Sequence, residues 1–195
     1  RGKHVLLEKP MATTVADAQA VIDVCRTAGV RLMVNFVHRF RAEYRRAWEA
    51  IRSGTIGRPV VAIDVIASAR SVLPDWVWKR EASGGGMMMY NGVHGTDRLA
   101  WLMGSRAVRV GAAMGSFCYP GGLEDSLVGS LTFESGGLGA IVQHKSTAER
   151  TLSGWHTHVF GTRGGLRIVT GREVVVQSET ESATWKTDRE DRFLD

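Results

Sequence analysis

Two short stretches of the chain combine residue types that can hold a polarised oxygen and move a proton. The first is HVLLEKPMATT, residues 4–14, in which Lys9 follows an apolar run and precedes Pro10. Proline restricts the residue before it to extended backbone, so the direction of the Lys9 side chain is constrained. An ammonium group held there can bind a substrate hydroxyl or polarise a carbonyl oxygen. The alternative is a surface lysine just ahead of a helix.

The second stretch is SGGGMMMYNGVHGTDRLAWLMG, residues 83–104. If residues 88–103 are helical, Tyr90, His94 and Asp97 lie on one face. A histidine between a phenol and a carboxylate is equipped for proton transfer, because its ordinary pKa is about 6.5. We expect Asp97, one turn further on, to orient the imidazole. The alternative is a hydrogen-bonded structural histidine.

The elements around Lys9 place it at a ligand-binding edge. Residues 4–8 form an apolar run typical of a strand buried on both faces, and RLMVNF, residues 31–36, predicts a second strand. Thr14 and Asp17 mark the start of the helix between them, and Gly29 marks its end. Such a βαβ unit has parallel strands, and ligands bind outside their carboxyl ends. Glu8 and Lys9 end the first strand there, and Asn35 ends the second.

The rest of the chain predicts a different architecture. A helix is expected over residues 42–53 and a strand over 60–68, followed by a helix that ends near Gly104. Gly92 and Gly95 inside that helix indicate the close approach of another backbone or a ligand. From Val108 onward, short apolar runs alternate with glycine-rich turns, which predicts a mainly antiparallel sheet. The glycine triplet 84–86 allows a tight turn and could present N–H groups to a ligand.

Composition excludes several classes of protein. The chain has 195 residues, 44% of them hydrophobic, and a net charge of +5 whose basic residues are scattered. We therefore predict no nucleic-acid partner, and the absence of a long apolar run predicts no membrane span. Cys25 and Cys118 match no metal or redox spacing, which favours a reducing, cytoplasmic setting.

His156 and His158 could form a metal pair but lack an obvious third ligand, so we predict no metal and interpret His156 as cleft lining.

Other candidates remain open between two interpretations. Trp76 and Trp78 either stack on a sugar ring or anchor a loop. His38 and Arg39 follow the second strand, and they either reach the cofactor or substrate edge or form a solvated basic pair.

Taken together, the EKP of residues 8–10, the later VNFVHRF and GGGMMMYNGVHGTD resemble the Gfo/Idh/MocA oxidoreductase family, which includes the inositol and glucose–fructose oxidoreductases. The resemblance implies an α/β protein: a C-terminal βαβ portion of a Rossmann domain (residues 1–36), then an α+β domain with an open, predominantly antiparallel sheet (residues 37–195). It implies that the glycine-rich nucleotide loop lies upstream of Arg1 and that the second domain continues past Asp195.

The resemblance also implies roles for single residues. Lys9 matches a lysine between nicotinamide and substrate, and His94 matches a catalytic acid/base. Tyr90 stands where the family often has aspartate, and we expect it to take part in catalysis and substrate binding. The NAD or NADP site is expected to include Glu8, Lys9, Pro10, Asn35 and Arg39. The substrate site is expected to include Lys9, Tyr90, Asn91, His94, Asp97 and His156.

The function implied by the resemblance is hydride transfer between NAD(P) and a secondary alcohol of a sugar, polyol or related hydroxy compound. The partner expected besides that substrate is a second copy of the chain, joined through the open sheet face as a dimer or tetramer. Tyr90 in place of aspartate keeps an alternative open, namely a non-catalytic sugar-sensing protein on the same scaffold. A third possibility is a plain oligomerisation fragment.

Overall fold

The computed structural model describes residues 2–69 and 71–187. At the amino end, β1 (Val5–Leu7), α1 (Val15–Thr27) and β2 (Leu32–Val34) form a βαβ unit whose two strands pair in parallel, as predicted. The side-chain oxygen of Thr14 accepts a hydrogen bond from the backbone N–H of Asp17 at 3.1 Å and so caps α1. Gly29, with φ of 63°, follows the helix, where a left-handed backbone conformation favours glycine.

One prediction for this unit is wrong. We expected the first strand to be buried on both faces, but Leu6 is 67% exposed and Met33, its partner on β2, is 47% exposed. The physical reason is that this sheet has only two strands among the described residues, so neither strand has neighbours on both sides. The apolar run therefore identified a strand correctly but not its surroundings.

The second sheet is the larger of the two. Its eight strands lie in the order β10-β9-β8-β7-β3-β6-β5-β4, and every neighbouring pair except β3 and β6 is antiparallel. This confirms the predicted mixed α/β fold with an open, mainly antiparallel sheet. The strands are β3 (Pro59–Ser68), β4 (Ala107–Gly115), β5 (Ser126–Phe133), β6 (Leu138–Lys145), β7 (Gly154–Gly161), β8 (Gly164–Val169), β9 (Glu173–Ser178) and β10 (Ser182–Lys186).

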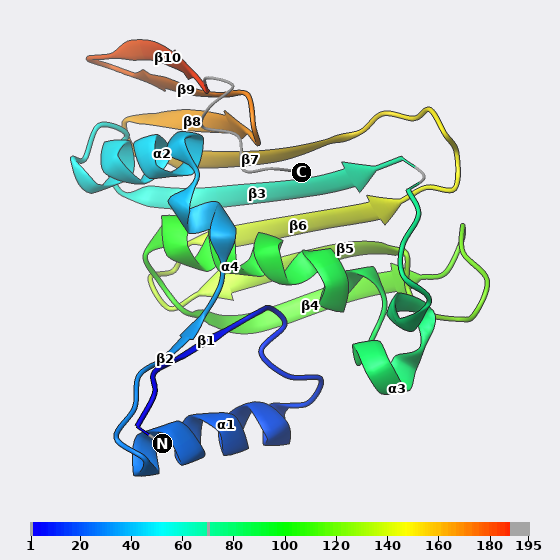
Figure 1. Cartoon of the computed structure of the whole chain (residues 1–195). Helices are drawn as coiled ribbons and strands as arrows, with labels where there is room; N and C mark the ends of the chain where they lie inside the picture. Colours follow the sequence, from blue (N-terminus) through cyan, green and yellow to red (C-terminus); the bar gives the residue numbers. More distant parts are fainter. Residues whose placement is uncertain (1, 70, 188–195) are drawn as a thin grey trace.

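The helices α2 (Ala42–Arg52) and α4 (Val93–Met103) cover one face of this sheet, and no helix of the described residues lies on the other (Figure 1). Along each strand, side chains alternate between the face that the helices cover and the open face. Leu127 and Ile141 point toward the helices and are buried, whereas Val128 and its partner Val142 lie on the open face. The core between helices and sheet positions the residues that follow β2 and those that α4 carries.

Four short helical segments complete the secondary structure of the described residues. A 3-10 helix (Val37–Phe40) leads from β2 into α2, and another (Asp75–Trp78) precedes α3 (Arg80–Ser83). A π-helical turn (Met88–Gly92) runs directly into α4. Within the described part of the chain, no helix combines the length and hydrophobicity that crossing a lipid bilayer requires.

Candidate active site

The carboxyl ends of β1 and β2 come together as the parallel pairing predicts. The Asn35 side-chain amide donates a hydrogen bond to a Glu8 carboxylate oxygen at 2.6 Å, and the backbone N–H of Asn35 donates to the Leu7 carbonyl oxygen at 2.7 Å. These contacts fix the junction from which Lys9 extends. Placement of Glu8 and Asn35 at one edge is therefore observed, and their role toward a cofactor stays a prediction.

Lys9 reaches from that edge to the π-helical turn. Its ammonium donates to the Tyr90 carbonyl oxygen at 2.6 Å and lies 4.9 Å from the centre of the Tyr90 ring. The Lys9–Pro10 peptide bond is cis. The pKa of Lys9 lies below its ordinary value because partial burial disfavours the charged form, an effect that the Glu8 carboxylate opposes. Lys9 is thus a partly buried, partly desolvated cation and not a fully solvated surface lysine.

His94 lies on the buried face of α4 and is only 5% exposed. Its Nδ1 atom has no hydrogen-bond partner among the described residues. Burial, and to a lesser degree the positive charges of Lys9 and Arg98, lower the pKa of His94 to about 3. At neutral pH the imidazole is therefore uncharged, which is the form that can accept a proton.

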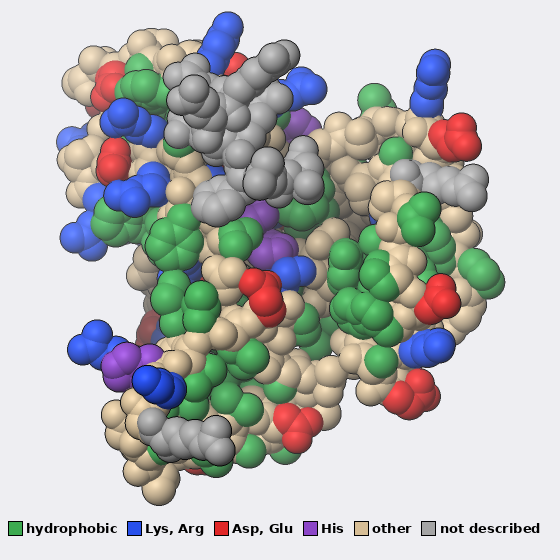
Figure 2. Space-filling model, in the orientation of Figure 1, with side chains coloured by type: hydrophobic (Ala, Val, Ile, Leu, Met, Phe, Trp, Pro, Cys, Tyr) green, Lys and Arg blue, Asp and Glu red, His purple; other side chains and the backbone are tan. Residues whose placement is uncertain are grey.

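Three aromatic rings surround His94. The ring centre of His38 lies 4.6 Å away, that of Phe36 6.1 Å and that of Trp155 6.3 Å. Figure 2 shows histidine side chains near the centre of this face of the molecule, beside a basic and an acidic side chain. The structure therefore brings Lys9, Tyr90 and His94 to one place. Two further residues lie there: His38, whose role the sequence left open, and Trp155, which it did not predict.

Asp97 has a different partner from the one predicted. Its two carboxylate oxygens accept hydrogen bonds from Arg39, at 2.9 Å from Nε and 2.5 Å from Nη2. The prediction that Asp97 orients the His94 imidazole is wrong, because no hydrogen bond joins the two side chains among the described residues and the carboxylate pairs with Arg39 instead. The pair instead ties α4 to the 3-10 helix after β2.

A fully buried ion pair lies behind the histidines. Arg98 donates to both carboxylate oxygens of Asp64, from Nε at 2.8 Å and Nη2 at 2.6 Å, and both side chains are 0% exposed. The Thr157 hydroxyl donates to the same carboxylate at 2.8 Å. The network thus joins α4, β3 and β7 through bonds that leave neither charge unpaired.

The same arginine fixes the tautomer of His38. Nη1 of Arg98 lies 2.9 Å from Nδ1 of His38, and because a guanidinium can only donate, Nδ1 must accept. Burial, and to a lesser degree the positive charge of Arg98, lower the pKa of His38 to about 2. His38 is therefore neutral and carries its proton on Nε2.

Comparison with known proteins agrees with this architecture. Residues 44–167 match the family model described as the GFO/IDH/MocA C-terminal domain, and residues 1–36 match that of the oxidoreductase family, NAD-binding Rossmann fold. The chain belongs to the Gfo/Idh/MocA oxidoreductase family. The division of the chain into units at residues 36 and 37 stays a prediction.

Members of the family with assigned names share much of the sequence. A 1,5-anhydro-D-fructose reductase from Ensifer adhaerens is 33% identical over 94% of this chain and 54% of its own length. A myo-inositol 2-dehydrogenase from Thermotoga maritima is 31% identical over 98% of this chain and 56% of its own. The crystal structure of an aldose-aldose oxidoreductase from Caulobacter crescentus complexed with glycerol superimposes with a TM-score of 0.84 at 28% identity, covering 95% of this chain and 56% of that one. This chain spans about half the length of these relatives.

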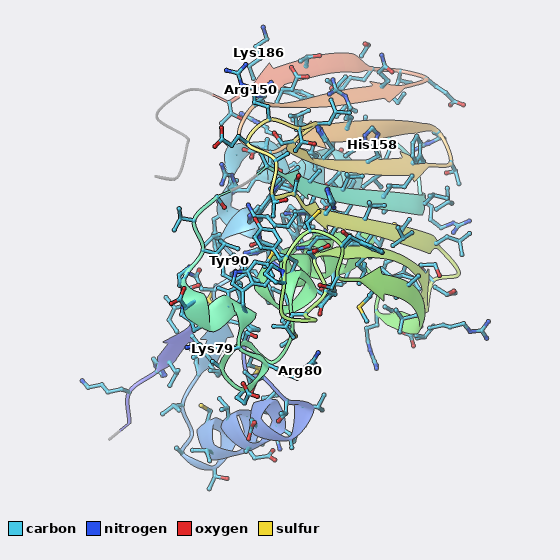
Figure 3. All side chains as sticks on the ribbon, turned by 90° about the vertical axis from the view of Figure 1, so that its right-hand side faces the viewer. Lys79, Arg80, Tyr90, Arg150, His158 and Lys186 are labelled. Atoms are coloured by element: carbon cyan, nitrogen blue, oxygen red, sulfur yellow. The ribbon has the colours of Figure 1, made fainter. Side chains whose placement is uncertain are left out.

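On this Gfo/Idh/MocA scaffold, the strand β7 contributes Trp155 to the site instead of His156. Thr157 and Val159 are buried beneath the helices, so Trp155 shares their face by strand alternation, while His156 and His158 lie on the open face. The interpretation of His156 as cleft lining is therefore wrong, because the preceding residue, Trp155, faces the site. The rings of His156 and His158 form no part of it. In Figure 3, His158 lies within the strands of the large sheet, apart from Tyr90.

The glycine triplet has an internal partner. The Glu124 carboxylate accepts hydrogen bonds from the backbone N–H groups of Gly86, at 2.9 and 3.0 Å, and of Met88, at 3.2 Å. A Cβ at Gly86 would lie 2.1 Å from the Glu124 carbonyl oxygen, so only glycine fits. The prediction that these N–H groups face a ligand is wrong, because the protein's own carboxylate occupies them.

The glycines inside the helix serve its contact with the sheet. A Cβ at Gly95 would lie 2.7 Å from Ile141 and 2.8 Å from an Asp64 carboxylate oxygen. The close neighbours are therefore side chains of the sheet and not a ligand or another backbone. This approach lets Arg98, one turn along α4, reach Asp64.

The two tryptophans of the loop before α3 have different neighbours. Trp78 stacks on Tyr119 with ring centres 4.3 Å apart, which favours loop anchoring. Trp76 is 46% exposed and lies edge-on to Tyr90 at 6.1 Å, so contact with a sugar remains a possible role for it alone.

A cluster outside the site could in principle hold a metal ion. Ligand atoms of Cys118, Asp125 and His144 lie within 4.8 Å of one another. However, one carboxylate oxygen of Asp125 already accepts three backbone N–H bonds from residues 117–119, and the other accepts from the Ser126 hydroxyl. The carboxylate organises its own loop, and we propose no metal there.

The buried ion pair generates a stability prediction. Arg98→Met leaves the Asp64 carboxylate buried without its charge partner, and we expect a loss of about 3–5 kcal/mol in the free energy of unfolding. The double variant with Asp64→Leu should lose less than the sum of the two single changes. The exposed pair of Arg46 and Glu49 provides the control, since Arg46→Met should cost about 1 kcal/mol or less. Urea unfolding measures all four, and equal losses for Arg98→Met and Arg46→Met would refute the assignment.

The lowered pKa values generate a second prediction. Below pH 6.5 an unfolded histidine binds a proton that folded His38 and His94 do not, since their pKa values are about 2 and 3. The unfolding free energy should therefore fall as pH is lowered from about 7 to 5, approaching about 1.4 kcal/mol per pH unit for each histidine. His94→Gln should reduce this slope by the contribution of one histidine, at most about 1.4 kcal/mol per pH unit. Parallel curves for the wild type and His94→Gln would contradict the neutral, buried His94.

Proposed function

We propose that the protein transfers a hydride between NAD(P) and a secondary alcohol of a sugar, polyol or related hydroxy compound. The observation that carries the proposal is the pairing of a neutral, buried His94 with the partly desolvated ammonium of Lys9 at the carboxyl end of a parallel strand. One group can take a proton and the other can hold an oxygen that becomes negative. The family membership and the names of the relatives support the same class of reaction.

The residues at this edge fit a nicotinamide cofactor. Glu8 and Asn35 offer a carboxylate and an amide to ribose or carboxamide groups, beside Lys9 and Pro10. Arg39 is the weaker candidate for this site, since Nε and Nη2 are already engaged by Asp97. The unpartnered Nδ1 of His94 shows that the buried polar groups here are not all satisfied by the described protein residues. When bound, the cofactor supplies the hydride acceptor for alcohol oxidation, or the donor in the reverse direction.

His94 and Lys9 have separate tasks in this scheme. As the carbon gives up its hydrogen with both electrons, His94 accepts the hydroxyl proton and the C–O bond becomes a carbonyl. Lys9 donates a hydrogen bond to that oxygen and stabilises its developing negative charge, which is worth most in a site that excludes water. For carbonyl reduction the same two groups act in reverse.

Tyr90 and Asn91 are proposed to bind substrate hydroxyls. Tyr90 lies under the Lys9 ammonium, so its phenol belongs to the same group of residues. Because the family resemblance leads us to expect aspartate where this chain has Tyr90, a non-catalytic sugar-sensing protein is the second candidate function. Activity measurements separate the two.

Removing either catalytic group should abolish most of the turnover. In the full-length protein, we expect His94→Ala to lower kcat by about 10²–10⁴ and Lys9→Ala by about 10² or more. Lys79→Ala, at an exposed lysine near α3, is the matched control and should leave kcat unchanged (Figure 3). NAD(P)H absorbance in the presence of a panel of sugars and polyols measures this. If both variants turn over at the wild-type rate, the catalytic assignment is contradicted.

We also propose that copies of the chain associate through the open face of the large sheet, in a cytoplasmic setting. The apolar side chains on that face include Val128 at 61%, Leu138 at 54% and Phe160 at 46% exposure. An exposed apolar patch of this kind is typical of an interface between subunits.

A charge placed in that patch should separate the subunits. Val128→Glu buries a carboxylate in the proposed interface and should shift the protein to a monomer in sedimentation velocity, with little change in its thermal midpoint. Val72→Glu changes a fully exposed valine outside the sheet and should leave the oligomeric state as in the wild type. A wild-type protein that is monomeric at high concentration would rule out this interface.

A further inference from the structure

A cavity of about 450 Å³ opens beside the proposed catalytic site. Its lining includes His38, Arg41, Trp155, Thr170 and Arg172. Two of these, His38 and Trp155, also form the wall around His94, with ring centres 4.6 and 6.3 Å from that imidazole. The cavity and the catalytic histidine therefore share two side chains.

The charges in the cavity favour an anion. The Arg41 guanidinium is held through Nε by the buried Glu43 carboxylate at 3.1 Å, and its terminal nitrogens have no hydrogen-bond partner among the described residues. Arg172 is exposed, and its side chain forms no ion pair within the same residues. No acidic residue of the described chain lines the cavity, so Glu43 behind Arg41 balances only one of the two positive charges.

His38 adds an uncharged hydrogen-bond donor to the cavity, its Nε2–H group. Since Arg98 donates to Nδ1, the proton of His38 is on Nε2, and that atom has no partner in the described structure. A fixed N–H donor beside two guanidinium groups matches an oxygen-rich anion, which only accepts hydrogen bonds.

Trp155 gives the cavity a rigid aromatic wall. Its ring stacks on His38 with centres 5.2 Å apart and planes 16° apart, and the Arg98 guanidinium lies 5.5 Å from the same ring. Contacts on two sides restrict the orientation of the indole. An aromatic wall next to cationic donors suits a carbohydrate ring that carries an acidic group.

We infer that this cavity binds an anionic group, a carboxylate or a phosphate, on a carbohydrate whose reacting hydroxyl lies at His94. Arg172 and Arg41 hold the anion, and Trp155 packs against the ring. The inference rests on the proposed function, since it treats the cavity as part of the substrate site. It assigns to the protein a preference for acidic sugars over neutral ones.

The test separates charge from shape. Isothermal titration calorimetry of the full-length protein with D-glucuronate, D-glucose 6-phosphate and two neutral ligands, D-glucuronamide and D-glucose, compares carboxylate, phosphate and neutral groups at one ionic strength. At least one anion should bind tenfold or more tightly than the neutral ligands, as expected of charge-assisted hydrogen bonds. Arg172→Gln should reduce this ratio below about threefold and leave the affinity for neutral ligands unchanged.

Two further variants keep the interpretation specific. Arg41→Gln should weaken anion binding in the same way, provided that its thermal midpoint matches the wild type. Arg109→Gln removes an exposed arginine from β4, at the opposite edge of the sheet, and should keep the full ratio. Equal binding of anionic and neutral ligands, or a ratio that survives Arg172→Gln, would overturn the inference. Because the readout is binding, loss of hydride transfer with every substrate would refute the proposed function without changing this result.

Discussion

The Asp64–Arg98 ion pair is the interaction on which the rest of the site depends. It joins the centre of β3 to α4 at a place where both side chains are removed from water. Gly95 lets the helix approach closely enough for the pair to form, and Thr157 completes the bonding of the carboxylate. A charge buried alone at this position would be strongly unfavourable, so the pair constrains how α4 lies on the sheet. His94 is one turn before Arg98 and is placed by the same constraint.

The pair also determines the electrostatics around the reacting groups. Arg98 donates to His38, and His38 packs against His94, so a positive charge lies close to two imidazoles that burial already keeps neutral. Lys9 approaches His94 from the other element, the βαβ unit, and adds a second positive charge. Both charges disfavour protonation of the ground-state histidine. His94 therefore holds an accepted proton weakly. Weak binding suits its proposed role, because His94 must give the proton back in the reverse reaction.

Much of this arrangement could be predicted from sequence where local signals were strong. The Thr14 cap, the glycine after α1, the parallel pair and the late run of strands all follow from periodicity and turn residues. Local patterns left the roles of Lys9 and His94 open, and only the family resemblance of their two motifs together pointed to one site with Tyr90. The strand VVAIDVIAS also contained a usable signal, since Asp64 is a lone charge in an apolar run, and such a charge calls for a buried partner. Asp64 was nevertheless not among the predicted site residues.

The remaining features depend on contacts between distant residues, which no local pattern encodes. Helical spacing places Asp97 near His94 on α4. Only the tertiary structure brings Arg39, from the 3-10 helix after β2, to the Asp97 carboxylate. Trp155 and His156 differ by one position in a strand, so the face of the sheet settles which enters the site. Glu124 lies 38 residues from the glycine whose N–H it binds.

Burial, together with the nearby charge of Arg98, keeps His38 and His94 neutral, and Arg98 leaves the proton of His38 on Nε2. Nitrogen NMR of the protein labelled with ¹⁵N-histidine tests this most directly, because the ring shifts report charge and tautomer separately. The account predicts that between pH 5 and 8 neither ring titrates and that His38 shows the Nε2–H pattern. A midpoint near pH 6.5 for either residue, or an Nδ1–H pattern for His38, would contradict it.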